Sequence, residues 1–218
     1  MQLSLNELEA ETKKAVRGAG LPWGVAEETS HATAWLARNG VDALPSLLDL
    51  LVQVDPSDDS GHRAKCAIEG RQQDKMSLCP VALGMAIVDR AQLLAGGKIL
   101  AFGPILRPVF LLPFLAWTAR IIARPVIVNF GKGDWMVGPS RLHGTGIASI
   151  SDVSIAPSFR CNASAAIIPS TDQPAASARP VVNPEIWQRL QLFARRTYVP
   201  ATEMSRVVGA GAGAIDND

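Results

Sequence analysis

The sequence predicts an α+β fold in which a helical N-terminal third packs on a mixed, mainly antiparallel sheet with helices. Residues 1–54 carry clear helix start and stop signals. The later apolar runs are short and are linked by tight turns, which favours hairpins over the crossover helices of a parallel sheet. With 218 residues, 48% of them hydrophobic and 19% charged, the chain can bury one sizeable core or two small ones.

Three helices are predicted in the N-terminal third: one from Leu5 to Gly18 or Gly20, one from Pro22 to about Arg38, and one that begins after Asp42. The first begins with a capping box, in which the side chains of Ser4 and Glu7 each accept a hydrogen bond from the other's backbone N–H. The turns between the three helices are short, so we expect a compact antiparallel unit.

The polar segment 55–63 is the best internal boundary of the chain. It divides a helical subdomain, residues 1–54, from an α+β body, residues 64–218, and we expect the two parts to form one compact unit. The body is predicted to contain helices at 80–94, 108–123 and 184–196, and strands at 98–102, 125–130, 135–137 and 149–156. Residues 131–134 are predicted to form a hairpin turn, and residues 169–183 are predicted to form a loop.

Charge and cysteine content exclude several classes of protein. The net charge of +1 gives no reason to expect a nucleic-acid partner. The longest apolar run, between Arg107 and Arg120, has about a dozen residues, fewer than the roughly 17–25 that a bilayer span needs. Three widely spaced cysteines and a polar, acidic start argue against a disulfide framework and a signal peptide. We therefore expect a cytoplasmic protein with no membrane partner.

The charge is also unevenly distributed along the chain. Residues 1–70 contain six Lys/Arg and eleven Asp/Glu, whereas the remaining residues contain fifteen and nine. Opposite charge on the two parts predicts attraction between them, within one chain or across a dimer. A chance distribution of surface charge is the alternative.

The C-terminal segment, RTYVPATEMSRVVGAGAGAIDND, concentrates the most polar chemistry. Gly209, Gly211 and Gly213 allow positive φ at alternate positions, so that backbone N–H groups can converge on an anion. Arg206, just upstream, would add a charge-assisted hydrogen bond to a carboxylate or phosphate. The spacing is neither a dinucleotide fingerprint nor a P-loop. A tail that binds no ligand is the alternative interpretation.

Four further residues of this segment complete the predicted site. Tyr198, Glu203 and Asp216 are the candidate catalytic, proton-transferring groups, and Asp218 is a candidate ligand-binding residue. Asp216, Asp218 and the terminal carboxylate could together bind a hard cation. Such an ending is more often solvated, so no metal site is predicted.

The second helix carries a possible acid–base pair. Trp23, Glu27, His31 and Trp35 follow one another at intervals of four residues and share one helical face. A carboxylate beside an imidazole can orient it for proton transfer. The opposite stripe of Ala26, Thr29, Ala32, Thr33 and Leu36 is the more obvious core face. An interface with a subunit or domain is therefore the favoured explanation of the two tryptophans, and catalysis is the alternative.

Charges and thiols in apolar surroundings give weaker hypotheses. Asp89 lies on an apolar helical stripe, so it is predicted to pair with Arg107 or Arg120, either as a core ion pair or as an anchor for an acidic ligand. Cys79 lies at a predicted helix N-terminus, where the pKa of a thiol can be lowered. Apolar filling is the default expectation for this cysteine.

The chain resembles a bacterial family catalogued as domain of unknown function 3726. The segments that carry the resemblance are SLNELEAETKKAVRGAGLPWGVAEE, RPVFLLPFLAWTAR and YVPATEMSRVVGAGAGAIDND. The resemblance implies that the two ends of the chain are its defining parts. It implies no activity, cofactor or substrate.

Two functions remain open. The first, also expected to be a homodimer, is a small-molecule enzyme or binding protein for an anionic metabolite, with a pocket between the helical third and the body that the C-terminal segment closes. The second is a non-catalytic structural or interaction subunit, homodimeric, in which the same segment is a structural strap. The sequence specifies no cofactor.

Overall fold

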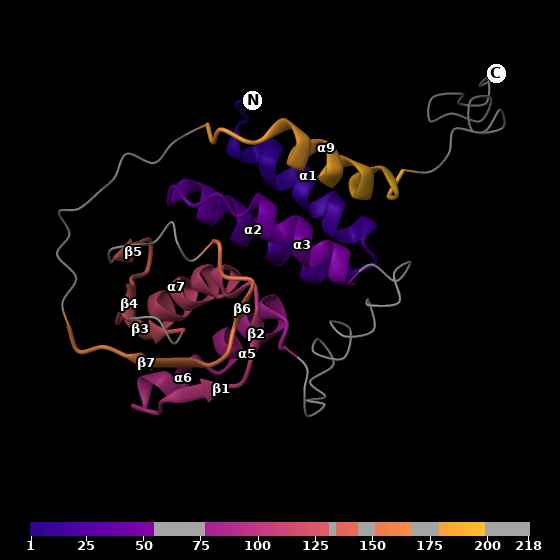
Figure 1. Ribbon diagram of the computed structural model, residues 1–218. Helices are drawn as coiled ribbons and strands as arrows, with labels where there is room; N and C mark the ends of the chain where they lie inside the picture. Colours follow the sequence, from indigo (N-terminus) through magenta and orange to yellow (C-terminus); the bar gives the residue numbers. More distant parts are fainter. Residues whose placement is uncertain (55–76, 131–133, 144–150, 167–178, 199–218) are drawn as a thin grey trace, which may run out of the picture.

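The computed structural model describes residues 1–54, 77–130, 134–143, 151–166 and 179–198, which form the predicted α+β fold (Figure 1). The helices are α1 Leu5–Gly18, α2 Trp23–Arg38, α3 Leu44–Val54, α5 Pro80–Asp89, α6 Ala91–Ala95, the 3₁₀ helix η2 Pro108–Phe110, α7 Leu111–Ile122 and α9 Pro184–Arg195. The strands are β1 Leu100–Phe102, β2 Ile105–Leu106, β3 Val126–Asn129, β4 Asp134–Val137, β5 Leu142–His143, β6 Ile155–Ala156 and β7 Phe159–Ala163.

Helix α1 begins as predicted because its capping box is formed. The Ser4 hydroxyl accepts a hydrogen bond from the backbone N–H of Glu7 at 3.1 Å, and the Glu7 carboxylate accepts one from the backbone N–H of Ser4 at 2.7 Å. The backbone hydrogen bond from Ser4 is also the largest cause of a lowered Glu7 pKa. The start of the first helix is therefore determined by hydrogen bonds between neighbouring residues.

Two helices flank α1, and one of them comes from the far end of the described chain. Helix α1 packs on α2 and on α9, and α9 also contacts α3 (Figure 1). The α1–α9 approach is close because Gly18 has no side chain: a Cβ there would lie 1.8 Å from the carbonyl oxygen of Phe193. The α9 segment thus lies against the helices of residues 1–54.

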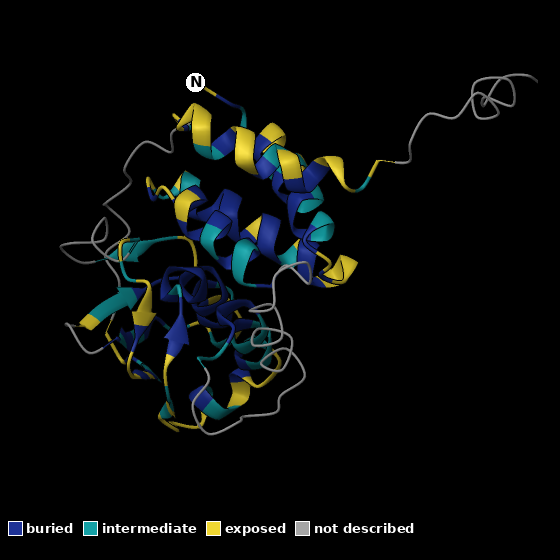
Figure 2. Cartoon of the chain, turned by 45° about the vertical axis from the view of Figure 1, so that its right-hand side comes forward, coloured by how far each residue is buried: buried dark blue, intermediate teal, exposed yellow. Residues whose placement is uncertain are grey.

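The body is built on a five-stranded antiparallel sheet of order β1-β7-β3-β4-β5, beside a two-stranded sheet of β2 and β6. Val126 and Val128 of β3 and Cys161 of β7 are buried on one face of the larger sheet. Helix α7 packs on β3 and β4, and most of its residues are buried, as the dark blue of this helix in Figure 2 shows, although Arg120 and Ile121 near its C-terminal end are exposed. No described helix has the length and apolarity that a bilayer crossing requires.

Three of the predicted elements differ from their form in the structure, and strands β2, β5 and β7 were not predicted. The predicted helix 80–94 is divided into α5 and α6, because Arg90 leaves the helical conformation at φ −111° and ψ 25°. The predicted helix 108–123 begins with the 3₁₀ turn η2. Of the predicted strand 149–156, residues 149 and 150 lie outside the described residues, and only β6 is extended in the remainder.

The predicted pairing of Asp89 is wrong. Asp89 and Arg120 are both exposed, whereas Arg107 forms an ion pair with Asp49 of α3. Arg107 adopts a left-handed backbone conformation, with φ of 41°, and its N–H donates to the carbonyl of Ser154 at 2.8 Å. The Asp49–Arg107 pair joins the acidic N-terminal part of the chain to the basic body.

Candidate functional site

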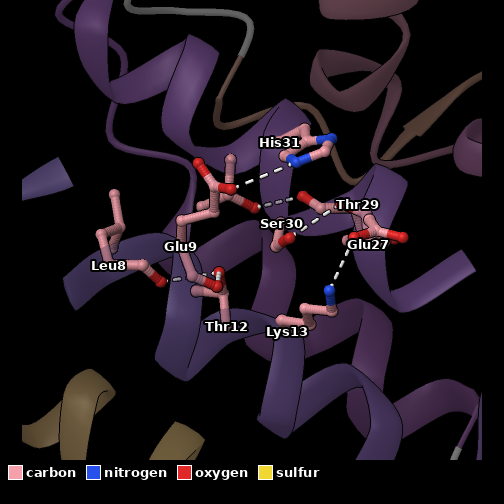
Figure 3. Close-up of polar contacts among 9 residues, drawn as sticks. Leu8, Glu9, Thr12, Lys13, Glu27, Thr29, Ser30 and His31 are labelled. Carbon is pink, nitrogen blue, oxygen red and sulfur yellow. Dashed lines mark hydrogen bonds and ion pairs between the residues drawn. The ribbon is translucent and has the colours of Figure 1, made fainter. Parts of the chain in front are cut away.

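Helices α1 and α2 are joined by three side-chain contacts, each four residues from the next. The contacts are Glu9–His31, Lys13–Glu27 and Arg17–Trp23. Figure 3 shows the first two, which cross from one helix to the other. The order of the pairs shows that the helices run antiparallel. One face of the α1–α2 pair is therefore lined with charged groups held in register.

The Glu9–His31 contact combines a carboxylate with an imidazole. Oε1 of Glu9 lies 3.2 Å from Nε2 of His31, and the side chains are 38% and 46% exposed. A negative charge beside Nε2 favours a proton on that nitrogen, which leaves Nδ1 as the acceptor in the neutral ring. This arrangement can accept and return a proton at Nδ1 while Glu9 holds the ring in place.

The predicted partner of His31 is therefore wrong. Glu27 lies one turn before His31 on α2, but its carboxylate accepts a hydrogen bond from Nζ of Lys13 at 2.7 Å. This hydrogen bond, followed by the charge of Lys13, lowers the pKa of Glu27, and the charge of His31 contributes less. The acid beside the imidazole comes from the neighbouring helix.

The Glu9–His31 pair faces a hollow of about 410 Å³ at the junction of the helical third and the body. Helix α2 contributes Glu28, His31, Trp35 and Arg38, spaced three, four and three residues apart, which places them on one face. Helix α1 contributes Glu9 and α7 contributes Trp117. The hollow thus has two indoles and four charged or titratable groups.

Two of these charges have no partner within the described part of the chain. Neither Arg38 nor Glu28 forms an ion pair or a side-chain hydrogen bond with a described residue. The Glu9 carboxylate, by contrast, lies 3.2 Å from Nε2 of His31. Arg38 and Glu28 are ten residues apart on α2, which is about 15 Å along the helix axis. The guanidinium therefore dominates its own end of the hollow.

The two tryptophans of α2 have different environments. Trp35 is only 8% exposed and belongs to the core, so its burial needs no partner molecule. Trp23 is 56% exposed, and the guanidinium of Arg17 lies 5.5 Å from the centre of its ring. The core stripe predicted on the same helix is confirmed: Ala26, Thr29, Ala32, Thr33 and Leu36 are all buried.

Most of the site residues predicted in the C-terminal segment lie outside the described residues. These are Glu203, Arg206, Gly209, Gly211, Gly213, Asp216 and Asp218. Tyr198 is described: it is 55% exposed, and its hydroxyl accepts a hydrogen bond from Nζ of Lys14 at 3.1 Å. This hydrogen bond is the largest cause of a raised Lys14 pKa. Tyr198 thus contacts α1, and its catalytic role stays a prediction.

The described cysteines, Cys79 and Cys161, are both free and buried. Cys79 stands at the N-cap of α5, but burial raises the pKa of its thiol and outweighs the two backbone hydrogen bonds that lower it. Burial likewise raises the pKa of Cys161 to about 12. The predicted lowering at Cys79 is therefore wrong, and the expectation of apolar filling is confirmed.

The charged and aromatic residues of this hollow that were not identified as site residues from the sequence are Glu9, Glu28, Arg38 and Trp117. A signal for Glu9 was present, because charged residues recur every four positions in both helices across a short turn. Antiparallel pairing across that turn places Glu9 opposite His31. No local pattern indicates Trp117, because α7 reaches the hollow only through tertiary packing.

Residues 3–80 match the model of a family described as "Protein of unknown function (DUF3726)". This match confirms the family resemblance over those residues, whereas the central and C-terminal segments that also carried it lie outside the matched range. Comparison with curated proteins and with solved structures gives no match. Glu9, Glu28, His31 and Arg38 all lie within the matched residues.

Proposed function

We propose that the protein binds a small organic anion, a carboxylate or a phosphate, in the hollow between α1, α2 and α7. The observation that carries the proposal is that Arg38, which has no carboxylate partner among the described residues, lines the same hollow as the Glu9–His31 pair. A guanidinium offers several N–H donors in a fixed fork, which suits the bidentate binding of such anions.

The shape of the hollow supports a ligand of metabolite size. Its volume of about 410 Å³ falls within the range of roughly 300–1,000 Å³ of small-molecule sites. Trp35 and Trp117 supply apolar surface for the uncharged part of the ligand. His31 lies two turns from Arg38, on the same face of α2, so a ligand held by Arg38 can extend along Trp35 toward the imidazole.

In this proposal His31 is the proton acceptor and Glu9 is its positioning residue. Nδ1 of His31 is the atom that would take the proton, because the Glu9 carboxylate stands beside Nε2. An enzyme that acts on an anionic metabolite would use this pair for proton transfer, whereas a binding protein would use it as a hydrogen-bonding group. Exchange of ligand hydrogen with solvent, measured with and without the protein, distinguishes the two. Protein-catalysed exchange would indicate an enzyme.

The binding step is tested by calorimetry with succinate, inorganic phosphate and glycerol phosphate. We expect one of these to bind, and we expect Arg38→Ala to raise its Kd at least tenfold, or about 1.4 kcal/mol. Arg189→Ala is the matched control, because Arg189 is an exposed helical arginine on α9. Absence of binding to the unmodified chain, or an equal loss in both variants, would contradict the proposal.

Closure of this site by the C-terminal segment remains part of the proposal. Removal of residues 209–218 should weaken anion binding and leave the melting temperature unchanged if the segment, with Arg206, contacts the ligand. If the segment is a structural strap, the truncated chain should lose stability in the absence of any ligand.

A second candidate function is that of an interaction subunit, and the exposed Trp23 favours it. Large exposed indoles are typical anchors of protein interfaces. The occupant we propose is a second copy of this chain, as in the homodimer expected from the sequence. Light scattering should show a dimer that Trp23→Ala dissociates and that Leu192→Ala, an exposed residue of α9, leaves intact. A monomeric unmodified chain would exclude this candidate.

A further inference from the structure

The large sheet carries a second hollow, distant in sequence from the first. It has a volume of about 650 Å³, and strands β1, β3, β4 and β7 contribute to its lining. The face of the sheet that packs on α7 is formed by buried residues such as Val126 and Cys161. Because side chains alternate between the two faces of a strand, the residues next to these buried positions line the opposite face.

The strand register aligns three polar side chains across this outer face. Asp134 of β4 pairs with Asn129 of β3, and Asn129 pairs with Arg160 of β7. All three residues line the hollow. Asp134 and Arg160 are therefore two strand spacings apart, a separation of about 9.6 Å between their Cα atoms.

The two charges of this row are not paired with each other. Nδ2 of Asn129 donates a hydrogen bond to Oδ1 of Asp134 at 2.7 Å, which fixes the carboxylate at one end of the row. Arg160 forms no ion pair with any described residue, and both charged residues are exposed. The hollow thus has a negative end at Asp134 and a positive end at Arg160.

Apolar side chains lie beside this charged row. Ile127 and Asn162 are register partners on the next row of the same face, and both line the hollow. Ile99, just before β1, also lines it and is 61% exposed. A ligand that bridges the charges would therefore meet an apolar surface as well as the amide of Asn162.

From this arrangement we infer that the outer sheet face binds a zwitterion, specifically a free α-amino acid with an apolar side chain. Its carboxylate binds Arg160 and its ammonium binds Asp134. The Cα atoms of Asp134 and Arg160 are about 9.6 Å apart. An amino acid can span this distance between the two side chains when each of its charged groups makes one charge-assisted hydrogen bond of about 2.8 Å. The apolar side chain lies on Ile127 and Ile99.

Charge complementarity distinguishes this ligand from simpler ions. An anion would leave the Asp134 carboxylate without a positive partner, and an amine would leave Arg160 without a negative one. A zwitterion satisfies both at once. The site shares no described lining residue with the Arg38 hollow, so this inference does not depend on the proposed function.

The test uses the full chain and three probes that share an isobutyl group. Leucine carries both charges, isocaproate lacks the ammonium, and isoamylamine lacks the carboxylate. Calorimetry should show that leucine binds at millimolar concentration or tighter, and that each of the other two binds at least tenfold more weakly. Isocaproate binding as tightly as leucine would overturn the assignment, as would absence of leucine binding.

Variants locate the site. Arg160→Gln and Asp134→Asn each remove one charge, and asparagine at 134 keeps an acceptor for Nδ2 of Asn129. Both should raise the Kd for leucine at least tenfold, with an unchanged melting temperature because both side chains are exposed. Lys98→Ala is the control, because Lys98 is an exposed charged residue close to β1 that does not line the hollow. Leucine binding that all three variants retain would overturn the inference.

Discussion

The carboxylate of Glu9 lies 3.2 Å from Nε2 of His31 and comes from the neighbouring helix. This contact sets the orientation of the imidazole toward the hollow that Arg38 and the two indoles line. Both side chains are more than one-third exposed, so the pair is expected to affect ligand chemistry more than folding.

Glu9→Gln should therefore distinguish a role of the pair in orienting the imidazole from a role in stabilising the fold. We expect the free energy of unfolding to change by less than about 1 kcal/mol, because exposed ion pairs contribute little. Nitrogen NMR of the neutral His31 ring should at the same time show less of the tautomer protonated at Nε2. A double-mutant cycle with His31→Gln measures the coupling energy, and a coupling well above 1 kcal/mol would show that the pair is mainly structural.

Gly18→Ala should strongly destabilise the helical layer. The new Cβ would meet the backbone oxygen of Phe193 at 1.8 Å, so α9 must move away from α1. Overpacking of this kind costs about 1–3 kcal/mol, which urea denaturation can measure. Gly24→Ala is the matched control, since a Cβ at that position of α2 meets nothing within 4 Å and should be neutral or stabilising. Equal effects of the two substitutions would contradict the close α1–α9 packing.

Asp49→Ala should weaken the link between α3 and the body. The substitution removes the carboxylate partner of Arg107, whose side chain is 16% exposed. The buried Nε of Arg107 already has no hydrogen-bond partner among the described residues. A loss of about 1–2 kcal/mol is expected, because the Asp49 side chain is 45% exposed and solvent screens part of the interaction. Asp89→Ala should change stability by less than about 0.5 kcal/mol. A larger effect at Asp89 would favour the pairing expected from the sequence.

Cys161 should make stability depend on alkaline pH. Burial raises the pKa of its thiol to about 12, whereas an unfolded cysteine has a pKa of about 8.5. The unfolded chain therefore loses this proton first, so the contribution to stability is complete below about pH 8.5 and is lost as the pH rises toward 12. Relative to Cys161→Ala, the free energy of unfolding should fall by about 1.4 kcal/mol per pH unit from about pH 9 upward. Parallel pH profiles of the two proteins would contradict a buried neutral thiol.

The fold could be predicted where short-range signals decide it. The capping box at Ser4, the Asn183 cap of α9 and the alternation of Val126 and Val128 specify helix starts and a strand from neighbouring residues alone. Strand β7 was not predicted, although Phe159 and Cys161 alternate with polar residues. Its position between β1 and β3 depends on pairing with segments far away in the sequence.

The candidate site could be predicted only in part, because it too depends on contacts between segments that are far apart in the sequence. His31 was identified, but its acid was assigned from the same helix, because spacing within one helix is visible in a sequence and pairing between helices is not. Arg107 shows the same limit: its partner Asp49 is fifty-eight residues away. The apolar surroundings of Arg107 indicated that a partner was needed without indicating which one.

The most direct test follows the His31 imidazole by NMR while the bound anion is titrated into the unmodified chain and into Arg38→Ala. His31→Gln assigns the signal among the three histidines. The proposal predicts a saturable shift of the His31 resonances in the unmodified chain, and no shift in Arg38→Ala at the same anion concentrations. An anion that binds without moving the His31 resonances, or that moves them equally in both proteins, would contradict a site shared by Arg38 and the Glu9–His31 pair.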